Sequence, residues 1–269
     1  MSKDDLGDRI KTRYESPECG RRFITGLPVI VRLDGKCFSR YTKNMDRPYD
    51  IRLVNTMKEV TRFLVEETNA LLGYTQSDEI TLVYHSDEEK SQIFYDGKIQ
   101  KMVSVLSSMC TAKFNEVVHI EFKEKMPLAF FDCRAFNVPN KNEAANTVLW
   151  RELDASKNSV SMLARHYFSH KQLHGKTSKE MQEMLFQEKN INWNNQPDFF
   201  KRGTFFQRKK IFKELSEDER IKIPEKYRPE KEIMVERTVV EELDMPRFSS
   251  VKNRIEVIFN GESPIVETI

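Results

Sequence analysis

Long hydrophobic runs are missing from this sequence. Nowhere do 18 apolar residues follow one another, and residues 1–11 contain no apolar stretch of the kind that forms the core of a secretion signal. A membrane-spanning or secreted protein is therefore not expected, and a cytoplasmic one is. Internal repeats and low-complexity tracts are missing as well.

Cysteine is scarce, and neither sign of charge dominates. The four cysteines form no Cys-x-x-Cys pair and no zinc-binding spacing, so reduced thiols are the simplest interpretation. Lysine and arginine number 44 against 42 aspartates and glutamates, which leaves a net charge of only +2. No overall field therefore attracts nucleic acid, and an RNA-binding function needs a local basic patch.

The composition is that of a protein with a substantial core. The chain has 269 residues, of which 39% are hydrophobic, and this suffices for one large domain or two. We expect a catalytic core over residues 1–140 and a helical and β-ribbon extension over residues 141–269. The two parts are expected to pack together as one continuous domain.

The apolar residues of the first part predict a definite order of elements. Strands are expected over residues 28–34 and 128–138, and a β-hairpin over residues 73–85. Core-facing helices are expected to begin at Asp50 and at about Lys98, the first of them ending at Gly73. The resulting order, β-α-β-β-α-β, is that of the ferredoxin-like plan, so the predicted fold class is α+β.

The second part gives a less regular pattern. Residues 143–170 are expected to be mostly helical, and a capping box over residues 177–180 opens a further helix. Two β-like runs, around residues 233–240 and 255–259, suggest a ribbon.

Acidic residues stand at the ends of two strands that the ferredoxin-like plan makes neighbours. Asp34 ends the first strand, and Asp78 with Glu79 lies at the tip of the hairpin. Because the first and third strands run antiparallel side by side, these side chains are expected to meet. Two such carboxylates can hold two Mg²⁺ ions, and the Gly35 carbonyl is a possible further ligand. The alternative is that both aspartates are ordinary turn residues.

Basic residues and free backbone N–H groups suggest where phosphates bind. The loop over residues 35–40 can cradle a triphosphate, with Lys36 or Arg40 adding charge, although an ordinary loop would look the same. Lys98 and Lys101 stand at a helix start, which favours phosphate, or they belong to a solvated face.

Residues 201–213 carry six basic side chains and no acidic ones, interleaved with aromatic residues. Such a run can grip an RNA backbone, and the alternative is a β-ribbon with a charged rim. Its candidate RNA contacts are Lys201, Arg202, Arg208, Lys209 and Lys210. The histidines at positions 166, 170 and 174 fall at helical spacing, but no Glu or Cys completes a zinc set, which favours a surface stripe.

Several of these segments together resemble the tRNA-histidine guanylyltransferase family, whose members add nucleotides in the 3′-5′ direction. The resemblance lies in VRLDGKCF (residues 31–38), RPYD (47–50) and GYTQSDE (73–79), and it continues through Trp150-Arg151 and KRGT (201–204). It covers nearly the whole chain.

The resemblance implies a polymerase-like palm in which two Mg²⁺ ions are held by Asp34, the Gly35 carbonyl and Asp78, with Glu79 beside them in the catalytic site. It implies a reaction in which ATP adenylylates a 5′-monophosphate of tRNA and the 3′-hydroxyl of an incoming nucleotide such as GTP then attacks. A homotetramer is also implied. The nucleotide-binding residues implied are Lys36, Cys37, Phe38, Ser39, Arg47, Asp50, Ser77, Lys98 and Lys101.

One departure from the eukaryotic members of that family narrows the expectation. They carry His-Ile-Asn-Asn after the Trp-Arg, whereas the corresponding run here is WRELDASKNS (residues 150–159). This is similar to the bacterial and archaeal "like-protein" branch, which implies templated repair of 5′-truncated tRNA rather than dedicated G addition to tRNA-His. Arg151, Asp154 and Asn158 become candidates for tRNA contact, and a structural role inside a helix is their alternative.

Two other functions remain open at this point. A nucleotide cyclase shares the palm and its acidic pair, but it would act on a nucleoside triphosphate without RNA. A non-catalytic RNA-binding module would stack bases on aromatic residues of exposed strand faces. Residues 28–34 offer no such aromatic residue, and three acids at the end of the sheet would have no purpose there.

Overall fold

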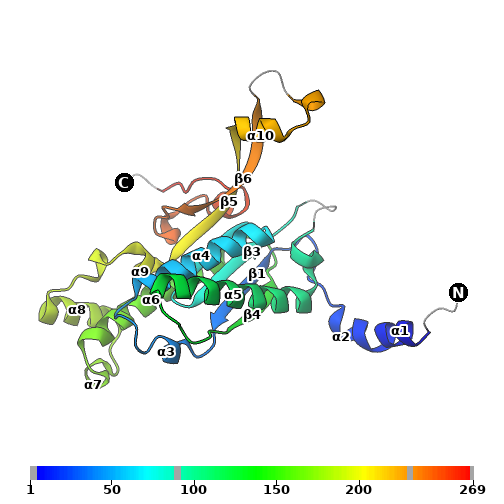
Figure 1. The fold of residues 1–269 in the computed structure, drawn as a ribbon. Coiled ribbons are helices and arrows are strands. Elements are labelled where there is room, and N and C mark those ends of the chain that lie inside the picture. The colour runs from blue at the N-terminus through cyan, green and yellow to red at the C-terminus, as the bar shows by residue number, and fades with distance from the viewer. Residues whose placement is uncertain (1–4, 88–91, 229–232, 267–269) are drawn as a thin grey trace.

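One antiparallel sheet organises the part of the chain that the computed structural model describes, residues 5–87, 92–228 and 233–266 (Figure 1). The strand order is β4-β1-β3-β2-β5-β6, and its first four strands confirm the predicted ferredoxin-like plan. The strands are β1 (Val29–Gly35), β2 (Leu72–Gln76), β3 (Glu79–Tyr84), β4 (Phe131–Asn137), β5 (Thr204–Glu214) and β6 (Met234–Leu243).

Two helices cover one face of the sheet, α4 (Ile51–Thr68) and α5 (Ile99–Phe122), as Figure 1 shows. Alternate residues of β1 point toward them, so that Val29, Val31 and Leu33 are fully buried in the larger core. Burying an aliphatic side chain of this size contributes about 1.5–3 kcal/mol, and the period-two pattern therefore fixes which face of β1 is covered.

Helix α4 begins where the sequence predicted and ends earlier. Asp50 caps it, accepting a hydrogen bond from the Arg52 N–H at 3.0 Å. The helix stops before Asn69, which takes the left-handed conformation (φ 58°), so the expected end at Gly73 is wrong. Gly73 instead lies in β2, where a Cβ would come within 2.5 Å of the Val65 side chain.

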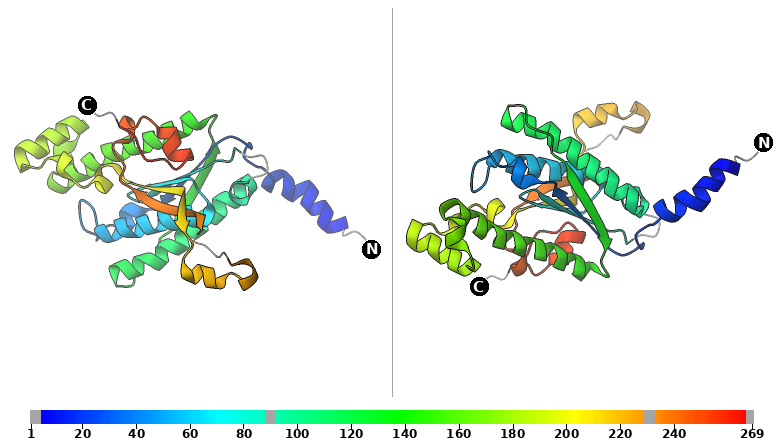
Figure 2. Two further views of the ribbon diagram at one scale, coloured as in Figure 1. Left: turned by 90° about the horizontal axis from the view of Figure 1, so that it is seen from above. Right: turned by 90° about the horizontal axis from the view of Figure 1, so that it is seen from below.

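The other face of the sheet is covered by α6 (Lys141–Tyr167) and α11 (Arg254–Phe259), which Figure 2 shows on the side away from α5. Ile30 and Val83 face this second core, together with Val257 and Ile258 of α11. The expectation of a strand over residues 255–259 is therefore wrong. A short apolar run fits a buried helix as well as a strand, because five residues do not resolve the two periods.

The remainder of the chain extends the palm at both ends. β5 pairs with β2 and continues with β6 into a two-stranded arm that projects from the body, with α10 (Glu217–Lys222) near its tip (Figure 1). The predicted capping box is present at the start of α8 (Ser178–Lys189). The remaining α-helices are α1 (Asp5–Ile10), α2 (Ser16–Cys19), α3 (Phe38–Tyr41), α7 (His170–Leu173) and α9 (Asp198–Arg202).

Five short helical turns complete the described elements: a π-helical turn at Lys11–Glu15 and 3₁₀ turns at Phe94–Gly97, Trp193–Asn195, Glu225–Tyr227 and Phe248–Ser250. Within the ranges described, no helix has the length and apolar character needed to cross a bilayer.

Candidate active site

The strand ends bring the predicted acids to one edge of the sheet. Asp34, next to last in β1, stands opposite Glu79 of β3 on one side and Asp132 of β4 on the other. Asp78 lies in the tight turn just before Glu79, where Ser77 takes a positive φ of 55°. Sequence positions far apart are thus joined by antiparallel pairing, as the ferredoxin-like plan requires.

The charges of Asp34 and Asp78 act on each other. Burial raises the pKa of Asp78, and the negative charge of Asp34 raises it further, while the Ser77 hydroxyl, which donates to Asp78 Oδ1 at 3.0 Å, opposes the shift. Among the residues that the structure describes, Arg134 forms an ion pair with Asp34, and its guanidinium lies 3.9 Å from the carboxylate. The pair is therefore an incompletely compensated concentration of negative charge.

This donor set fits Mg²⁺. In the described parts of the chain, no three His, Cys, Asp or Glu side chains converge as a complete metal-binding group. Mg²⁺ does not need one, since it is usually bound by one or two carboxylates and completes its octahedron with water and substrate phosphates. The repulsion between the Asp34 and Asp78 carboxylates is what a divalent cation would relieve, and the Gly35 carbonyl adjoins them in sequence.

Gly35 is required here for a steric reason. A Cβ on this residue would come within 2.2 Å of the Phe38 ring, which folds back under the end of β1. Phe38 is itself buried and stacks on Tyr41, with the ring centroids 4.9 Å apart. Glycine thus lets the chain turn directly after Asp34 into the predicted phosphate loop.

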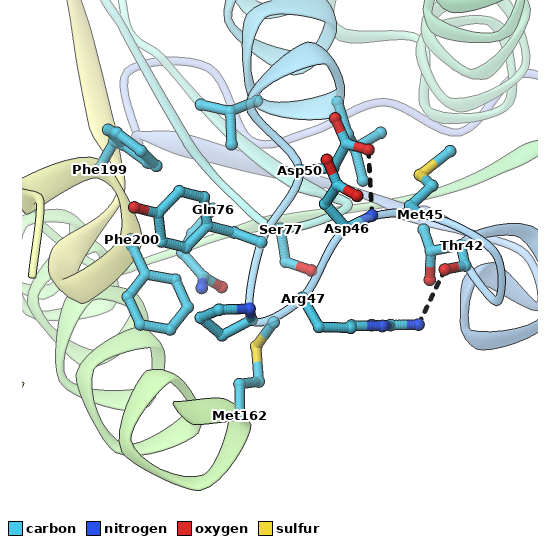
Figure 3. Close-up of a pocket in the computed structure, with 14 residues that line it drawn as sticks. Thr42, Met45, Asp46, Arg47, Asp50, Gln76, Ser77, Met162, Phe199 and Phe200 are labelled. Carbon is cyan, nitrogen blue, oxygen red and sulfur yellow. Dashed lines mark hydrogen bonds between the residues drawn. The ribbon is translucent and has the colours of Figure 1, made fainter. Parts of the chain in front are cut away.

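A hollow of about 540 Å³ lies near this edge (Figure 3). Three residues predicted to bind nucleotide line it, namely Arg47, Asp50 and Ser77. The Arg47 guanidinium donates to the Thr42 carbonyl at 2.8 Å and is otherwise exposed.

Asp50, which lines this hollow, has a structural role. Burial alone would raise its pKa, but hydrogen bonds from the Arg52 side chain and from the Asp46 and Arg52 N–H groups hold the pKa below its usual range. Its carboxylate caps α4 and orders the segment before it. Its contribution to ligand binding is therefore to shape the wall of the hollow.

The apolar wall of the hollow comes from parts of the chain that the sequence analysis did not assign to any site. Phe199 and Phe200 of α9 pack on Tyr49 with ring centroids 5.1 and 4.9 Å away, and Met162 of α6 faces them (Figure 3). A Phe-Phe pair more than a hundred residues downstream carries no local signal of a nucleotide pocket. Only the tertiary arrangement reveals it.

The predicted phosphate loop is exposed where its role requires it. Lys36, Cys37 and Ser39 are exposed, whereas Phe38 is buried, so that only the backbone of Phe38 is available to a ligand. Cys37 takes the left-handed conformation, with φ 57° and ψ 35°, and precedes α3. Such alternation of conformations turns successive N–H groups toward one side, as in anion-binding nests.

Lys98 and Lys101 do not reach this edge within one chain. The backbone of Lys98 forms an isolated antiparallel β-bridge with that of Arg22, next to the start of β1. The Lys101 ammonium lies 4.9 Å from the centre of the Tyr95 ring. Asp34 is at the other end of β1, roughly 20 Å away along a strand of this length. The resemblance implies that both lysines meet a second set of phosphates, and this assignment stays a prediction.

Glu79 is held by two arginines. The buried Arg151 guanidinium, 5% exposed, donates to Glu79 and, at 3.2 Å, to Asp154, which also accepts from Asn158 at 3.2 Å. Arg32 of β1 approaches the other Glu79 oxygen at 3.5 Å. Arg151 therefore links α6 to the turn that carries Asp78, a role that differs from the predicted tRNA contact.

Four of the six basic residues over residues 201–213 form ion pairs with acidic neighbours. Arg208 is half-buried and points to the backbone of α4. The sequence of one strand does not show the charges of its neighbours, so these ion pairs could not be predicted, and the RNA contact of the run stays a prediction. The ion pairs are Lys201 and Arg202 with Asp198 (3.0 and 2.7 Å), Lys209 with Glu241 (2.6 Å) and Lys210 with Glu236 (3.0 Å).

The three histidines of the predicted surface stripe are exposed at the end of α6 and around α7. The ring centroids of His170 and His174 lie 6.0 Å apart.

Comparison with known proteins adds to this geometry. A family model described as tRNAHis guanylyltransferase matches residues 9–139, and one described as the Thg1 C terminal domain matches residues 132–246. The tRNA(His) guanylyltransferase of Schizosaccharomyces pombe is 30% identical over 228 residues, which cover 78% of this chain and 85% of the yeast protein.

Two solved structures are similar along most of the chain. A bacterial tRNA(His) guanylyltransferase (Thg1)-like protein in complex with ATP is 42% identical, with a TM-score of 0.71 over 76% of this chain and 87% of that one. A bacterial protein of the same description in complex with GTP is 34% identical, with a TM-score of 0.69 over 91% and 94%.

Proposed function

Because the chain belongs to the tRNA(His) guanylyltransferase family and is a nucleotidyltransferase, we propose that it adds nucleotides to the 5′ end of tRNA in the 3′-5′ direction. The observation that carries this proposal is the acidic pair, Asp34 and Asp78, beside a hollow that Ser77 and Arg47 line. A binding module would have no use for repelling carboxylates at the end of its sheet.

The incoming nucleotide occupies the hollow between Ser77 and α9. Its base packs against the apolar wall formed by Tyr49, Phe200 and Met162, and its triphosphate extends to the exposed backbone over residues 36–39. Support comes from the similar bacterial proteins, which were solved with ATP and with GTP. Lys36 adds positive charge at the phosphates.

Asp34, Asp78 and the Gly35 carbonyl would hold two Mg²⁺ ions. When bound, Mg²⁺ favours deprotonation of the attacking hydroxyl and neutralises the leaving phosphates. The chain's own part is to fix both carboxylates on the rigid ends of β1 and the β2–β3 turn. Glu79 positions the β2–β3 turn and thereby Asp78, because its carboxylate forms ion pairs with Arg32 and Arg151.

The reaction has two chemical stages on a monophosphorylated end. A 5′-phosphate oxygen of tRNA attacks the α-phosphorus of ATP and releases pyrophosphate, leaving an adenylylated 5′ end. The 3′-hydroxyl of the incoming nucleotide then attacks the 5′-phosphorus of the tRNA and releases AMP. A 5′-triphosphate end needs only the second step, with pyrophosphate as the leaving group.

The substrate we propose is a 5′-truncated tRNA, repaired by templated addition. The run after Trp150-Arg151 lacks the His-Ile-Asn-Asn of the eukaryotic family members, and this supports the repair function over dedicated G addition. Asp154 and Asn158 lie at the solvent-facing end of the hydrogen bonds that link α6 to Glu79 through Arg151. We place both residues toward the RNA. Arg151, Lys201, Arg202, Lys209 and Lys210 each form an ion pair with a carboxylate of this chain, and their contact with tRNA stays a prediction.

Arg208 is half-buried against α4, so we give it a structural role as well. We also propose a homotetramer, which the family resemblance implies, and we assign Lys98 and Lys101 to a second set of phosphates. Four free cysteines, two of them exposed, are compatible with a reducing compartment such as the cytoplasm.

The proposal is tested with labelled nucleoside triphosphates and a tRNA that lacks its first 5′ nucleotide. Addition of the one nucleotide complementary to the opposite strand is the expected result. Cyclic nucleotide formed without RNA would establish a cyclase instead. Tight tRNA binding with no extension, under conditions in which ATP and Mg²⁺ are saturating, would leave only a binding module.

A further inference from the structure

A second hollow, of about 1,350 Å³, opens beside the first and is strongly basic. It lies between the loop after β1 and the segment that leads from α5 to β4. Lys36, Arg40 and Lys125 line it, and Glu124 is its one acidic residue besides these. Arg52 also lines it, but its charge is paired with Asp50. The hollow therefore carries a net positive charge.

Its three lining cations differ from Lys209 and Lys210 of β5, which pair with carboxylates of β6. Within the described ranges, Lys36, Arg40 and Lys125 make no ion pair with any carboxylate. Lys36 and Arg40 are exposed, as is Lys125. Unpaired cations gathered around one concavity are what a phosphate-bearing ligand requires.

The same hollow also has apolar lining residues that are open to solvent. Leu128 is 66% exposed and Phe130 is 54% exposed, and both line the hollow together with Phe122 and Pro127. Large apolar side chains exposed beside unpaired cations form the combination that binds single-stranded nucleic acid, in which bases stack on the apolar wall while phosphates meet the cations. A double helix hides its base faces and would leave this wall unused.

The hollow begins at the same strand end as the acidic pair. The Lys36 N–H donates to the Phe130 carbonyl at 2.8 Å, and Gly35 is paired with Phe131 in the sheet. Asp34 immediately precedes Gly35, so a polynucleotide whose 5′ end is at Asp34 has its neighbouring strand within reach of Phe130. Beside the 5′ end of a tRNA, the unpaired strand is the 3′ tail of the acceptor stem.

We infer that this hollow, walled by Lys36, Arg40, Lys125, Leu128 and Phe130, binds the single-stranded 3′ tail of the tRNA whose 5′ end is being extended. The inference rests on the proposed function, since it takes tRNA as the substrate. Binding of the 3′ tail in this hollow would position the acceptor end while the 5′ end reacts at the neighbouring carboxylates.

The experiment compares the binding of a full-length tRNA with that of the same tRNA lacking its unpaired 3′ nucleotides. The wild-type protein should bind the full-length tRNA about tenfold more tightly. Lys125→Glu and Phe130→Ala should each remove most of this difference, and Lys125→Glu should also flatten the salt dependence of full-length tRNA binding. Lys123→Glu, in the same loop but outside the lining, should behave as the wild type does.

The melting temperature and the nucleotide affinity establish that each variant is folded. Both quantities should match those of the wild type, because Lys125 and Phe130 are exposed. Wild-type protein that binds both RNAs equally overturns the inference alone and leaves the proposed function intact. Loss of nucleotide affinity in Lys125→Glu, with the tail preference preserved, overturns it as well, because the hollow would then serve free nucleotide. Failure of the wild type to bind any tRNA overturns the proposed function together with the inference.

Discussion

Arg151 illustrates what a single residue does here. Its guanidinium is 5% exposed and is shared between Glu79 of the catalytic turn and Asp154 of the same helix. A buried arginine bound to two carboxylates is expensive to remove, because its partners are left unpaired. The residue therefore fixes the turn, and thereby Asp78, against α6.

Arg151→Lys tests this positioning role. A lysine keeps the charge but not the forked geometry, so Glu79 is held less firmly and kcat should fall by about tenfold, whereas the Kd for tRNA should change by less than about twofold. Single-turnover rates and tRNA titrations separate the two quantities. Weaker tRNA binding with an unchanged rate would instead restore the direct RNA contact that the sequence suggested.

Cys37 reports on the phosphate loop. It is exposed beside the proposed triphosphate position, as Cys19 is exposed in α2, whereas Cys110 and Cys133 are shielded. Burial raises the pKa of Cys133 to about 12 and that of Cys110 still further, so at pH 8 only Cys37 and Cys19 should react with a thiol reagent.

Bound nucleotide should cover Cys37 and not Cys19. At about ten times its Kd, ATP or GTP should slow the labelling of Cys37 by about tenfold and leave the labelling of Cys19 unchanged. Mass spectrometry of the labelled peptides measures both rates in one sample. Equal rates at Cys37 with and without saturating nucleotide would contradict the placement of the triphosphate on residues 36–39.

At the scale of elements, the sequence predicts what is local and periodic. The alternation in residues 28–34 and the apolar stripes of α4 and α5 gave the palm, because each pattern determines which side is buried. Two features were not predicted from the sequence. The run over residues 255–259 is too short for its period to be read, and the charge of β5 depends on β6, a strand that the sequence of β5 does not contain.

Gly203 joins α9 to β5 in a conformation open only to glycine, with φ 80° and ψ −168°. An added Cβ would lie 2.6 Å from the Thr75 carbonyl oxygen. We expect Gly203→Ala to lower the free energy of unfolding by about 2–3 kcal/mol. Gly26→Ala is the control, since Gly26 also has φ 80° but nothing within 4 Å of its Cβ position; about 1 kcal/mol is expected there.

Urea denaturation of both variants measures the difference. Equal losses would show that the clash beneath Gly203 is relieved by a small shift, and that α9 is not held tightly against β2. This matters for function because α9 carries Phe199 and Phe200 into the nucleotide hollow.

At the scale of the whole molecule, the candidate site is a product of the tertiary structure. The acidic pair was predictable because one topological rule makes β1 and β3 neighbours. The apolar wall from α6 and α9 was not, and neither was the distance of Lys98 from the acids, since helix length and direction decide both. A family resemblance identifies residue types at positions, but only coordinates show which of them share one cavity.

Glu152 is a buried carboxylate that links α6 to the backbone of Phe248. Both of its carboxylate oxygens accept from the Phe248 N–H at 3.0 Å, and it is 2% exposed. Burial raises its pKa, although the Phe248 hydrogen bond and Arg202 oppose the shift. In the pH window between the usual pKa of a glutamate and this raised value, the folded state binds more protons than the unfolded state. Stability contributed by Glu152 is therefore lost as the pH rises through that window.

Glu152→Gln should remove this dependence. The free energy of unfolding of the variant should fall less steeply across the window than that of the wild type, as measured by denaturant titration at a series of pH values. Glu188→Gln, at an exposed position on α8, should follow the wild-type curve. Parallel curves for all three proteins would mean that Glu152 keeps its ordinary pKa in the fold.

The most direct test of the account is the rate of 5′ nucleotide addition by proteins in which one carboxylate at the end of the sheet is replaced. Asp34→Asn and Asp78→Asn should each reduce the rate by about 1,000-fold while the melting temperature stays the same or rises, because a charge repulsion is removed. Asp132→Asn, at the exposed position opposite Asp34 on β4, should keep the rate within about threefold. Wild-type rates in the folded Asp34→Asn or Asp78→Asn protein would contradict the claim that this pair carries the reaction.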